Sequence, residues 1–125
     1  MKSWMFPIET LGEFSEYRER YVFKTNDGDG YLVFLLGATI DGDTVTLIGH
    51  FDRGGRVYQI FDGRSYRHAG DIDNPQLGKA LALYRAAATG GVIEYVMRSK
   101  RLCALHLRAQ AYMRGVPCDG SFLQS

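Results

Sequence analysis

Hydrophobic positions follow two different periods along the chain. Between residues 31 and 68, β-branched and aromatic residues form short segments that are separated by clusters rich in Gly and Asp. From residue 74 onward, apolar residues recur every three or four positions. The first pattern is typical of strands joined by tight turns and the second of helices, so the chain should change from strand to helix near its middle.

The first pattern predicts an antiparallel meander of four to five strands. The predicted strands lie at residues 31–40, 44–51, 57–61 and 65–68, and residues 21–23 also prefer strand. Turn-forming clusters separate them at residues 26–30, 41–43, 53–56 and 62–63. Connections this short bring successive strands into antiparallel pairs. Alternation in 44–51 divides the residues between two faces: Val45, Leu47 and Gly49 on one, Thr46, Ile48 and His50 on the other.

Helices are predicted on both sides of the meander. Residues 9–20 have capping-box spacing at Thr10 and Glu13, with Leu11, Phe14, Tyr17 and Tyr21 on one face. Asn74 and Pro75 are typical of a helix start, and Gly90 and Gly91 of a helix end. A second C-terminal helix is predicted from residue 92 to residue 114. Its first residues, 92–97, are rich in β-formers and leave a strand as the alternative.

Together these elements predict one α+β domain over residues 1–125. It consists of an N-terminal helix, the antiparallel β-meander of four to five strands, and two C-terminal helices packed on the sheet. A chain of 125 residues can bury a core of its own. Residues 119–125 are expected to form a flexible tail.

Composition and cysteine usage favour a cytoplasmic protein. Apolar residues make up 46% of the chain, yet no uncharged apolar segment approaches the roughly 20 residues of a membrane-spanning helix. The first residues lack the apolar stretch of a signal peptide. Cys103 and Cys118 are too few for a disulfide scaffold.

Charge is divided between the two halves of the chain, although the net charge is only +1. Residues 26–73 hold eight Asp against four Arg, whereas residues 74–116 hold seven Lys and Arg against one Glu. Such an asymmetry affects association and the choice of partner, and it also favours self-association.

Motifs for metal binding and catalysis are weak. The cluster at residues 26–30 resembles part of a calcium loop, but Leu36 stands where the bidentate Glu would be needed. A zinc site could draw on Cys103, His106 and Cys118, with His68 or His50, but a single C-x-x-H pair is a weak signal. Neither a nucleophile turn around Ser65 or the cysteines nor a phosphate-binding loop is present. We therefore assign no catalytic residue, metal or cofactor.

Two charged surfaces are the candidate binding sites. The first is the basic C-terminal helix, with Arg98, Lys100, Arg101, Arg108, Tyr95 and Tyr112. The second is the acidic set of turn residues, Asp27, Asp29, Asp41 and Asp43. Tyr and Arg are the residues that most often anchor protein interfaces. We expect a non-enzymatic protein-binding module, with nucleic-acid binding through the basic helix and an unrecognised enzyme as alternatives. By analogy of size alone, small α+β proteins of phages and mobile elements that inhibit a host protein suggest the same class.

Overall fold

Four antiparallel strands form a meander in which each strand pairs with the next along the chain. They are β1 (Glu19–Lys24), β2 (Gly30–Ile40), β3 (Asp43–Asp52) and β4 (Val57–Ser65). The computed structural model describes residues 19–40, 43–66 and 75–115. The meander follows from the connections of two to five residues, because a chain that turns in so few residues returns beside the strand it has left.

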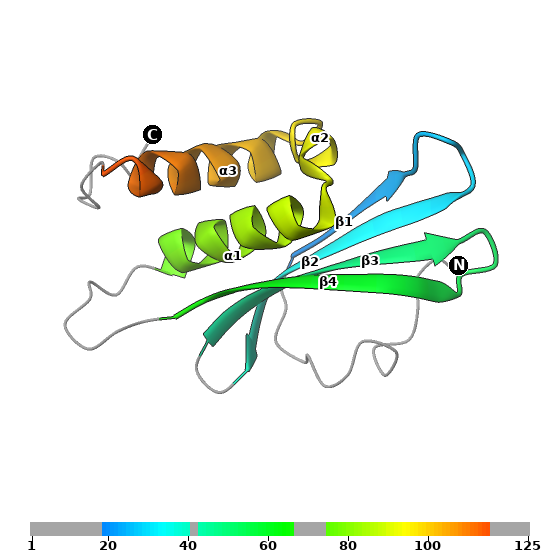
Figure 1. Ribbon diagram of the computed structural model, residues 1–125, viewed down its shortest axis with the longest axis horizontal. Coiled ribbons are helices and arrows are strands. Elements are labelled where there is room, and N and C mark those ends of the chain that lie inside the picture. The colour runs from blue at the N-terminus through cyan, green and yellow to red at the C-terminus, as the bar shows by residue number, and fades with distance from the viewer. Residues whose placement is uncertain (1–18, 41–42, 67–74, 116–125) are drawn as a thin grey trace.

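Three helices follow the sheet in sequence and lie over one of its faces (Figure 1). They are α1 (Pro75–Gly90), α2 (Ile93–Val96) and α3 (Lys100–Met113). Helix α1 packs against β3 and β4, and α3 packs beside α1. The predicted α+β class, with an antiparallel sheet and C-terminal helices over it, is confirmed.

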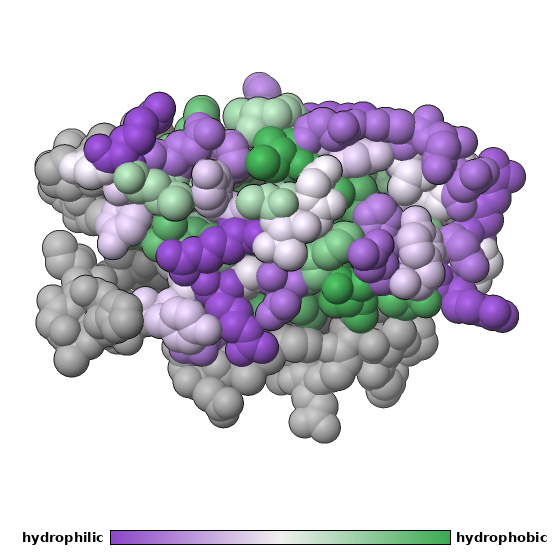
Figure 2. Space-filling view, in the orientation of Figure 1, coloured by the Kyte–Doolittle hydropathy of each residue, from purple (hydrophilic) through white to green (hydrophobic). Residues whose placement is uncertain are grey.

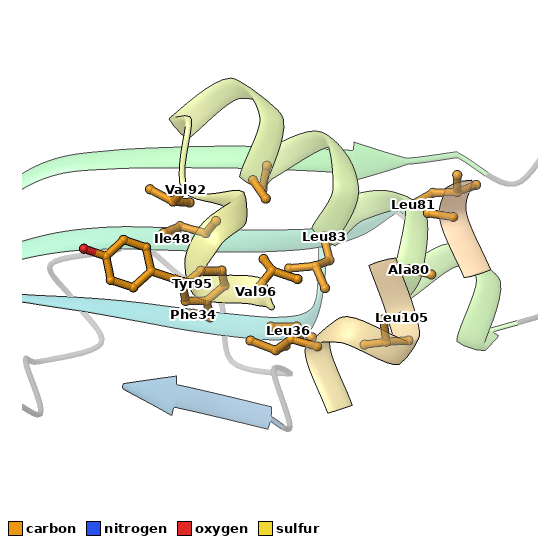
Figure 3. Close-up of a cluster of buried hydrophobic side chains, with 14 of the residues drawn as sticks. Phe34, Leu36, Ile48, Ala80, Leu81, Leu83, Val92, Tyr95, Val96 and Leu105 are labelled. Atoms are coloured by element: carbon orange, nitrogen blue, oxygen red, sulfur yellow. The ribbon is translucent and has the colours of Figure 1, made fainter. Parts of the chain in front are cut away.

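The main core lies between the sheet and the helices. Figure 3 shows side chains of the sheet and of all three helices converging there. Phe34 and Leu36 of β2 and Ile48 of β3 are fully buried against α1, α2 and α3. The alternation predicted for β3 is confirmed, because Ile48 belongs to this core and Val45 and Leu47 belong to the opposite face.

A second apolar cluster is buried on the other face of the sheet. It consists of Val33, Leu35, Val45, Leu47 and Phe51. Successive residues of β2 therefore enter different clusters, and both clusters are buried. A strand buried on both faces is apolar at every position, which explains why 31–40 lacks the simple alternation of a half-exposed strand.

Helix α1 lies unusually close to β4. Every fourth residue of α1 on this side is small: Gly78, Ala82, Ala86 and Gly90. A Cβ atom added at Gly63 of β4 would lie less than 3.0 Å from the backbone of Ala82 and Ala86. At one end of this row the Ser65 hydroxyl donates to the Gly78 carbonyl at 2.8 Å. The absence of a side chain at Gly63 is what lets the helix backbone rest directly on the strand.

This packing corrects the predicted turn at residues 62–63. Asp62 and Gly63 lie inside β4, where they pair with Leu47 and Thr46 of β3. The Asp–Gly pair has the composition of a turn, but its glycine serves the close approach of α1. The predicted strand at 65–68 is thus not separate, since Ser65 ends β4, Tyr66 lies outside it, and 67–68 are outside the described residues.

The predicted N-terminal helix falls mostly outside the described part of the chain. Residues 9–18 are not described, and the last two residues of the prediction, Glu19 and Arg20, are in β1. The predicted helix face also included Tyr21, but Tyr21 lies in β1, where it pairs with Phe34 of β2.

The region from residue 92 to residue 114 is helical but interrupted. The strand alternative for 92–97 is wrong, because Ile93–Val96 is helix α2. A continuous helix is also wrong, since residues 97–99 form a turn before α3. Ser99 is the N-cap of α3, and its hydroxyl accepts a hydrogen bond from the backbone N–H of Leu102 at 3.3 Å. Such a cap satisfies a donor that the helix itself cannot pair.

Replacing Gly63 tests the contact between α1 and β4. We expect Gly63→Ala to lower the free energy of unfolding by about 3 kcal/mol, because the new methyl group overlaps the helix backbone. Urea denaturation measures the change. Gly54→Ala is the matched control, since its nearest neighbour would be the Asp52 carboxylate at 3.4 Å. Equal stability of the two variants would contradict this packing.

Candidate functional site

The outward side of α3 carries a row of residues that point away from the core. We call this row the α3 outer face; it consists of Lys100, Ala104, Leu107, Ala111 and Arg114. Their spacing of three and four residues places them on one side of a helix, over a length of about 20 Å. Leu107 is 53% exposed at its centre, whereas Leu102, Leu105 and Ala109 are buried on the opposite side. Figure 2 shows hydrophobic and hydrophilic residues side by side along the upper rim, where α2 and α3 lie.

Arg101, one of the predicted binding residues, is engaged inside the protein. Its Nε and Nη2 atoms donate to the two carboxylate oxygens of Glu19, each at 3.1 Å. The Lys79 ammonium also donates to Glu19, at 2.6 Å, and so does the Tyr21 hydroxyl, at 2.7 Å. This Glu19 network joins β1, α1 and α3 through a single carboxylate. Arg101 therefore acts mainly as a structural cross-link.

The pKa of Glu19 reflects the same network. Partial burial raises the pKa, but hydrogen bonds from Arg101, Lys79 and Tyr21 outweigh it and lower the value to about 2. For Tyr21, burial and the hydrogen bond to the Glu19 carboxylate raise the pKa to about 12. At neutral pH the network thus holds an ionised carboxylate and a protonated phenol.

Arg98 is also held by neighbours, at the end of α2. Its guanidinium lies 3.6 Å from the Glu94 carboxylate and 4.3 Å from the centre of the Tyr95 ring. It also donates to the side-chain oxygen of Asn26, in the turn between β1 and β2. These contacts tie the end of the β1–β2 hairpin to α2 and reduce the capacity of Arg98 to bind a partner.

The two predicted tyrosines have different roles. Tyr95 is buried in the main core, and its hydroxyl accepts from the backbone N–H of Asn26 at 3.0 Å. In Figure 3 that hydroxyl points away from the other labelled side chains. Tyr112 is exposed near the end of α3. Of the six predicted residues, Arg98, Lys100 and Tyr112 are exposed, Arg101 and Arg108 are half-buried, and Tyr95 is buried.

The predicted acidic surface is not one surface. Asp27 and Asp29 lie in the turn before β2, whereas Asp43 pairs with Ile40 at the other end of that strand. Asp41 is outside the described residues. The Asp27 carboxylate accepts from the Thr25 hydroxyl at 2.6 Å and from the Asp29 backbone N–H at 2.9 Å, and both contacts lower its pKa. Asp27 thus orders its own turn, as an Asp in this position commonly does.

Among the described residues, the side chains of His50, His106 and Cys103 contact different neighbours. His50 Nδ1 lies 2.9 Å from the Tyr58 hydroxyl, and His106 stacks on Tyr84. Burial lowers the pKa of His50 and that of His106. Cys103 contacts the sulfur of Met97 at 3.8 Å. Within residues 19–40, 43–66 and 75–115, no three potential metal ligands lie together, and none of the helices has the length and apolar character that crossing a membrane requires.

Sequence reasoning missed the apolar part of this region. Met97 and Leu107 are exposed, and neither was predicted to belong to a binding surface. The signal that could have identified Leu107 is its angle on the helix, opposite the stripe that contains Leu102, Leu105 and Ala109. Glu19 was missed because residues 9–20 were predicted to be helical.

Comparisons of the chain with protein-family models, with curated proteins and with solved structures found no match.

Removing the Glu19 charge tests the network. The interaction stabilises the fold above the unfolded-state pKa of about 4.5 and is lost as the pH falls toward the folded-state value of about 2. We expect Glu19→Gln to lower the free energy of unfolding at pH 7 by about 2 kcal/mol, allowing for screening of partly exposed partners. The difference from the wild type should shrink to about half or less at pH 3.

Urea denaturation at several pH values measures this difference. Glu94→Gln is the matched control, because its ion pair with Arg98 is largely exposed and should contribute about 0.5 kcal/mol or less. A Glu19→Gln difference that stays constant from pH 7 to pH 3 would show that the carboxylate charge does not stabilise the fold.

Proposed function

We propose that this chain is a protein-binding module that uses the α3 outer face. The observation that carries the proposal is the exposed Leu107 at the centre of that face, between Lys100 and Arg114. An apolar centre with a charged rim is the usual composition of a protein interface. The proposed function involves no catalysis and no cofactor.

The contacts of the arginines favour a protein partner over a nucleic acid. Phosphate binding depends on cations that are free to replace counterions along a nucleic-acid backbone. Arg98 and Arg101 instead contact the carboxylates of Glu94 and Glu19. The exposed cations that remain on the α3 outer face stand at its two ends, with Leu107 and two alanines between them.

The composition of this face defines the class of partner. Small alanine side chains allow another backbone to approach α3 closely, and Leu107 would enter a shallow apolar pocket. Lys100 and Arg114 would contact acidic residues at the edges of that pocket. A helix of the partner with an apolar stripe between acidic residues fits these requirements.

Nucleic-acid binding is the second candidate, because Lys100, Arg108 and Arg114 all lie on α3 or at its end. A single substitution separates the two functions. Leu107→Lys adds a positive charge to the α3 outer face, so it weakens contact with an apolar pocket but strengthens contact with phosphates.

The experiment captures partners on the tagged chain from a nuclease-treated lysate of the source organism and identifies them by mass spectrometry. We expect a stoichiometric protein that Leu107→Lys retains at least tenfold less well, since burying a leucine contributes about 2 kcal/mol. Ala88→Lys is the matched control, because it adds the same charge at an exposed position of α1.

Binding of oligonucleotides would contradict the proposed function. Labelled single-stranded and duplex oligonucleotides, measured by fluorescence polarisation at low salt, should not bind the wild-type chain. If they bind, if Leu107→Lys binds them more tightly, and if the protein partners disappear with nuclease, the chain binds nucleic acid instead.

A further inference from the structure

The outer edge of β4 has features of an association site. Among residues 19–40, 43–66 and 75–115, no strand pairs with this edge. Ile60 is 40% exposed and Tyr66, just beyond the strand, is 57% exposed. Figure 2 shows hydrophobic residues over the right half of β4, which is its N-terminal half. An edge strand of nine residues with exposed apolar side chains and no Pro can pair with another strand.

The other edge of the sheet is better protected. β1 has only six residues, of which Glu19, Arg20 and Lys24 are charged. Glu19 is further held by α1 and α3 through Lys79 and Arg101. In β4 the two charged residues, Asp62 and Arg64, form an ion pair with each other at 3.0 Å. Charged residues on a short edge strand commonly prevent it from pairing with another strand. In β4 the charges of Asp62 and Arg64 neutralise each other, so this protection is absent.

The backbone of β4 indicates which residues face outward. Nη1 of Arg85, on α1, donates to the carbonyl of Arg64 at 2.6 Å. Because Arg85 does not belong to the sheet, that carbonyl points to the outer edge. The N–H and C=O groups of a strand residue point the same way and alternate along the strand. The register from Gln59 to Ser65 is regular, so Ile60 and Asp62 also present their backbone groups outward.

We propose that the chain forms a two-fold symmetric dimer in which β4 pairs antiparallel with β4 of a second copy, centred on Gly63. In this register Asp62 lies opposite Arg64 of the second copy, and Ile60 lies opposite Tyr66. Two-fold symmetry makes each of these pairs occur twice. Opposite charges and aromatic–aliphatic pairs directly across a sheet are both stabilising.

Neighbouring registers are less favourable. Centring the pair on Asp62 places two aspartates opposite each other, and centring it on Arg64 places two arginines opposite each other. Like charges in such positions destabilise strand pairing. Centring it on Phe61 places Ile60 opposite Asp62. The charge pattern of β4 is therefore self-complementary in the register centred on Gly63.

Arg85 does not prevent this arrangement. A carbonyl oxygen can accept two hydrogen bonds, so the Arg64 carbonyl can accept from Arg85 and from a backbone N–H of the second copy. The dimer is independent of the proposed function, because it uses a different surface from the α3 outer face.

A charge-swap experiment tests both the dimer and its register. Sedimentation equilibrium measures the molecular mass of the full chain over a range of concentrations. We expect the wild type to shift from monomer to dimer as concentration rises. Asp62→Arg and Arg64→Asp, each alone, should weaken dimerisation at least tenfold, because each places only like charges across the pair. An equimolar mixture of the two variants should form a heterodimer, since every pair then has opposite charges.

Two controls complete the test. Thermal denaturation should show that both variants fold as the wild type does, because their ion pair is only partly buried and contributes little to stability. Leu107→Lys should dimerise like the wild type. A wild-type chain that stays monomeric at every concentration would overturn the proposal. The outer edge of β4 would then be open to pairing with a strand of another protein. Dimers that persist in both single variants, or a mixture that fails to associate, would overturn it as well.

Discussion

The fold depends on the direct contact between the backbone of α1 and β4. Gly78, Ala82, Ala86 and Gly90 form a row along α1 that has almost no side-chain volume, and Gly63 removes the side chain from the facing strand. The helix therefore lies closer to the sheet than a row of leucines would allow. This distance sets the height of the helical layer above the sheet. It also fixes where α3 lies, because α3 packs beside α1.

The ion pairs join the same layers at two places. Glu19 connects β1 to α1 and α3, and the contacts of Arg98 and Tyr95 connect the β1–β2 turn to α2. At both places, charged side chains form ion pairs or hydrogen bonds within the protein, and these contacts hold the layers together. The basic character of the second half of the chain thus overstates the positive charge that a partner would meet. What remains exposed on α3 is mixed, with cations around an apolar centre.

Much of the fold could be predicted from local pattern. Alternation in β3 placed Ile48 and Leu47 on opposite faces, and Pro75 and Gly90 marked the ends of α1. The errors arose where one residue type has two uses. Asp62–Gly63 has the composition of a turn, and only the position of α1 shows that its glycine is needed inside a strand. Ser99 is an unremarkable polar residue in the sequence, although it begins a new helix.

The candidate site was less predictable because its decisive contacts are distant in sequence. Arg101 meets a residue 82 positions away, and Arg98 meets one 72 positions away. No periodicity in a single sequence reports such pairings. Sequence could name the basic residues of this region but could not tell which of them are neutralised.

The arrangement of the two proposed surfaces has a consequence for binding. Helix α1 contacts both β4 and α3, so it separates the β4 edge from the α3 outer face (Figure 1). A dimer joined through β4 would leave the α3 outer face of each copy open and would present two identical faces related by the two-fold axis. A partner that is itself dimeric, or that carries the recognised helix twice, would then bind both faces in one complex. Binding of the second face becomes intramolecular, so a modest contact around a single exposed leucine could still give a stable assembly.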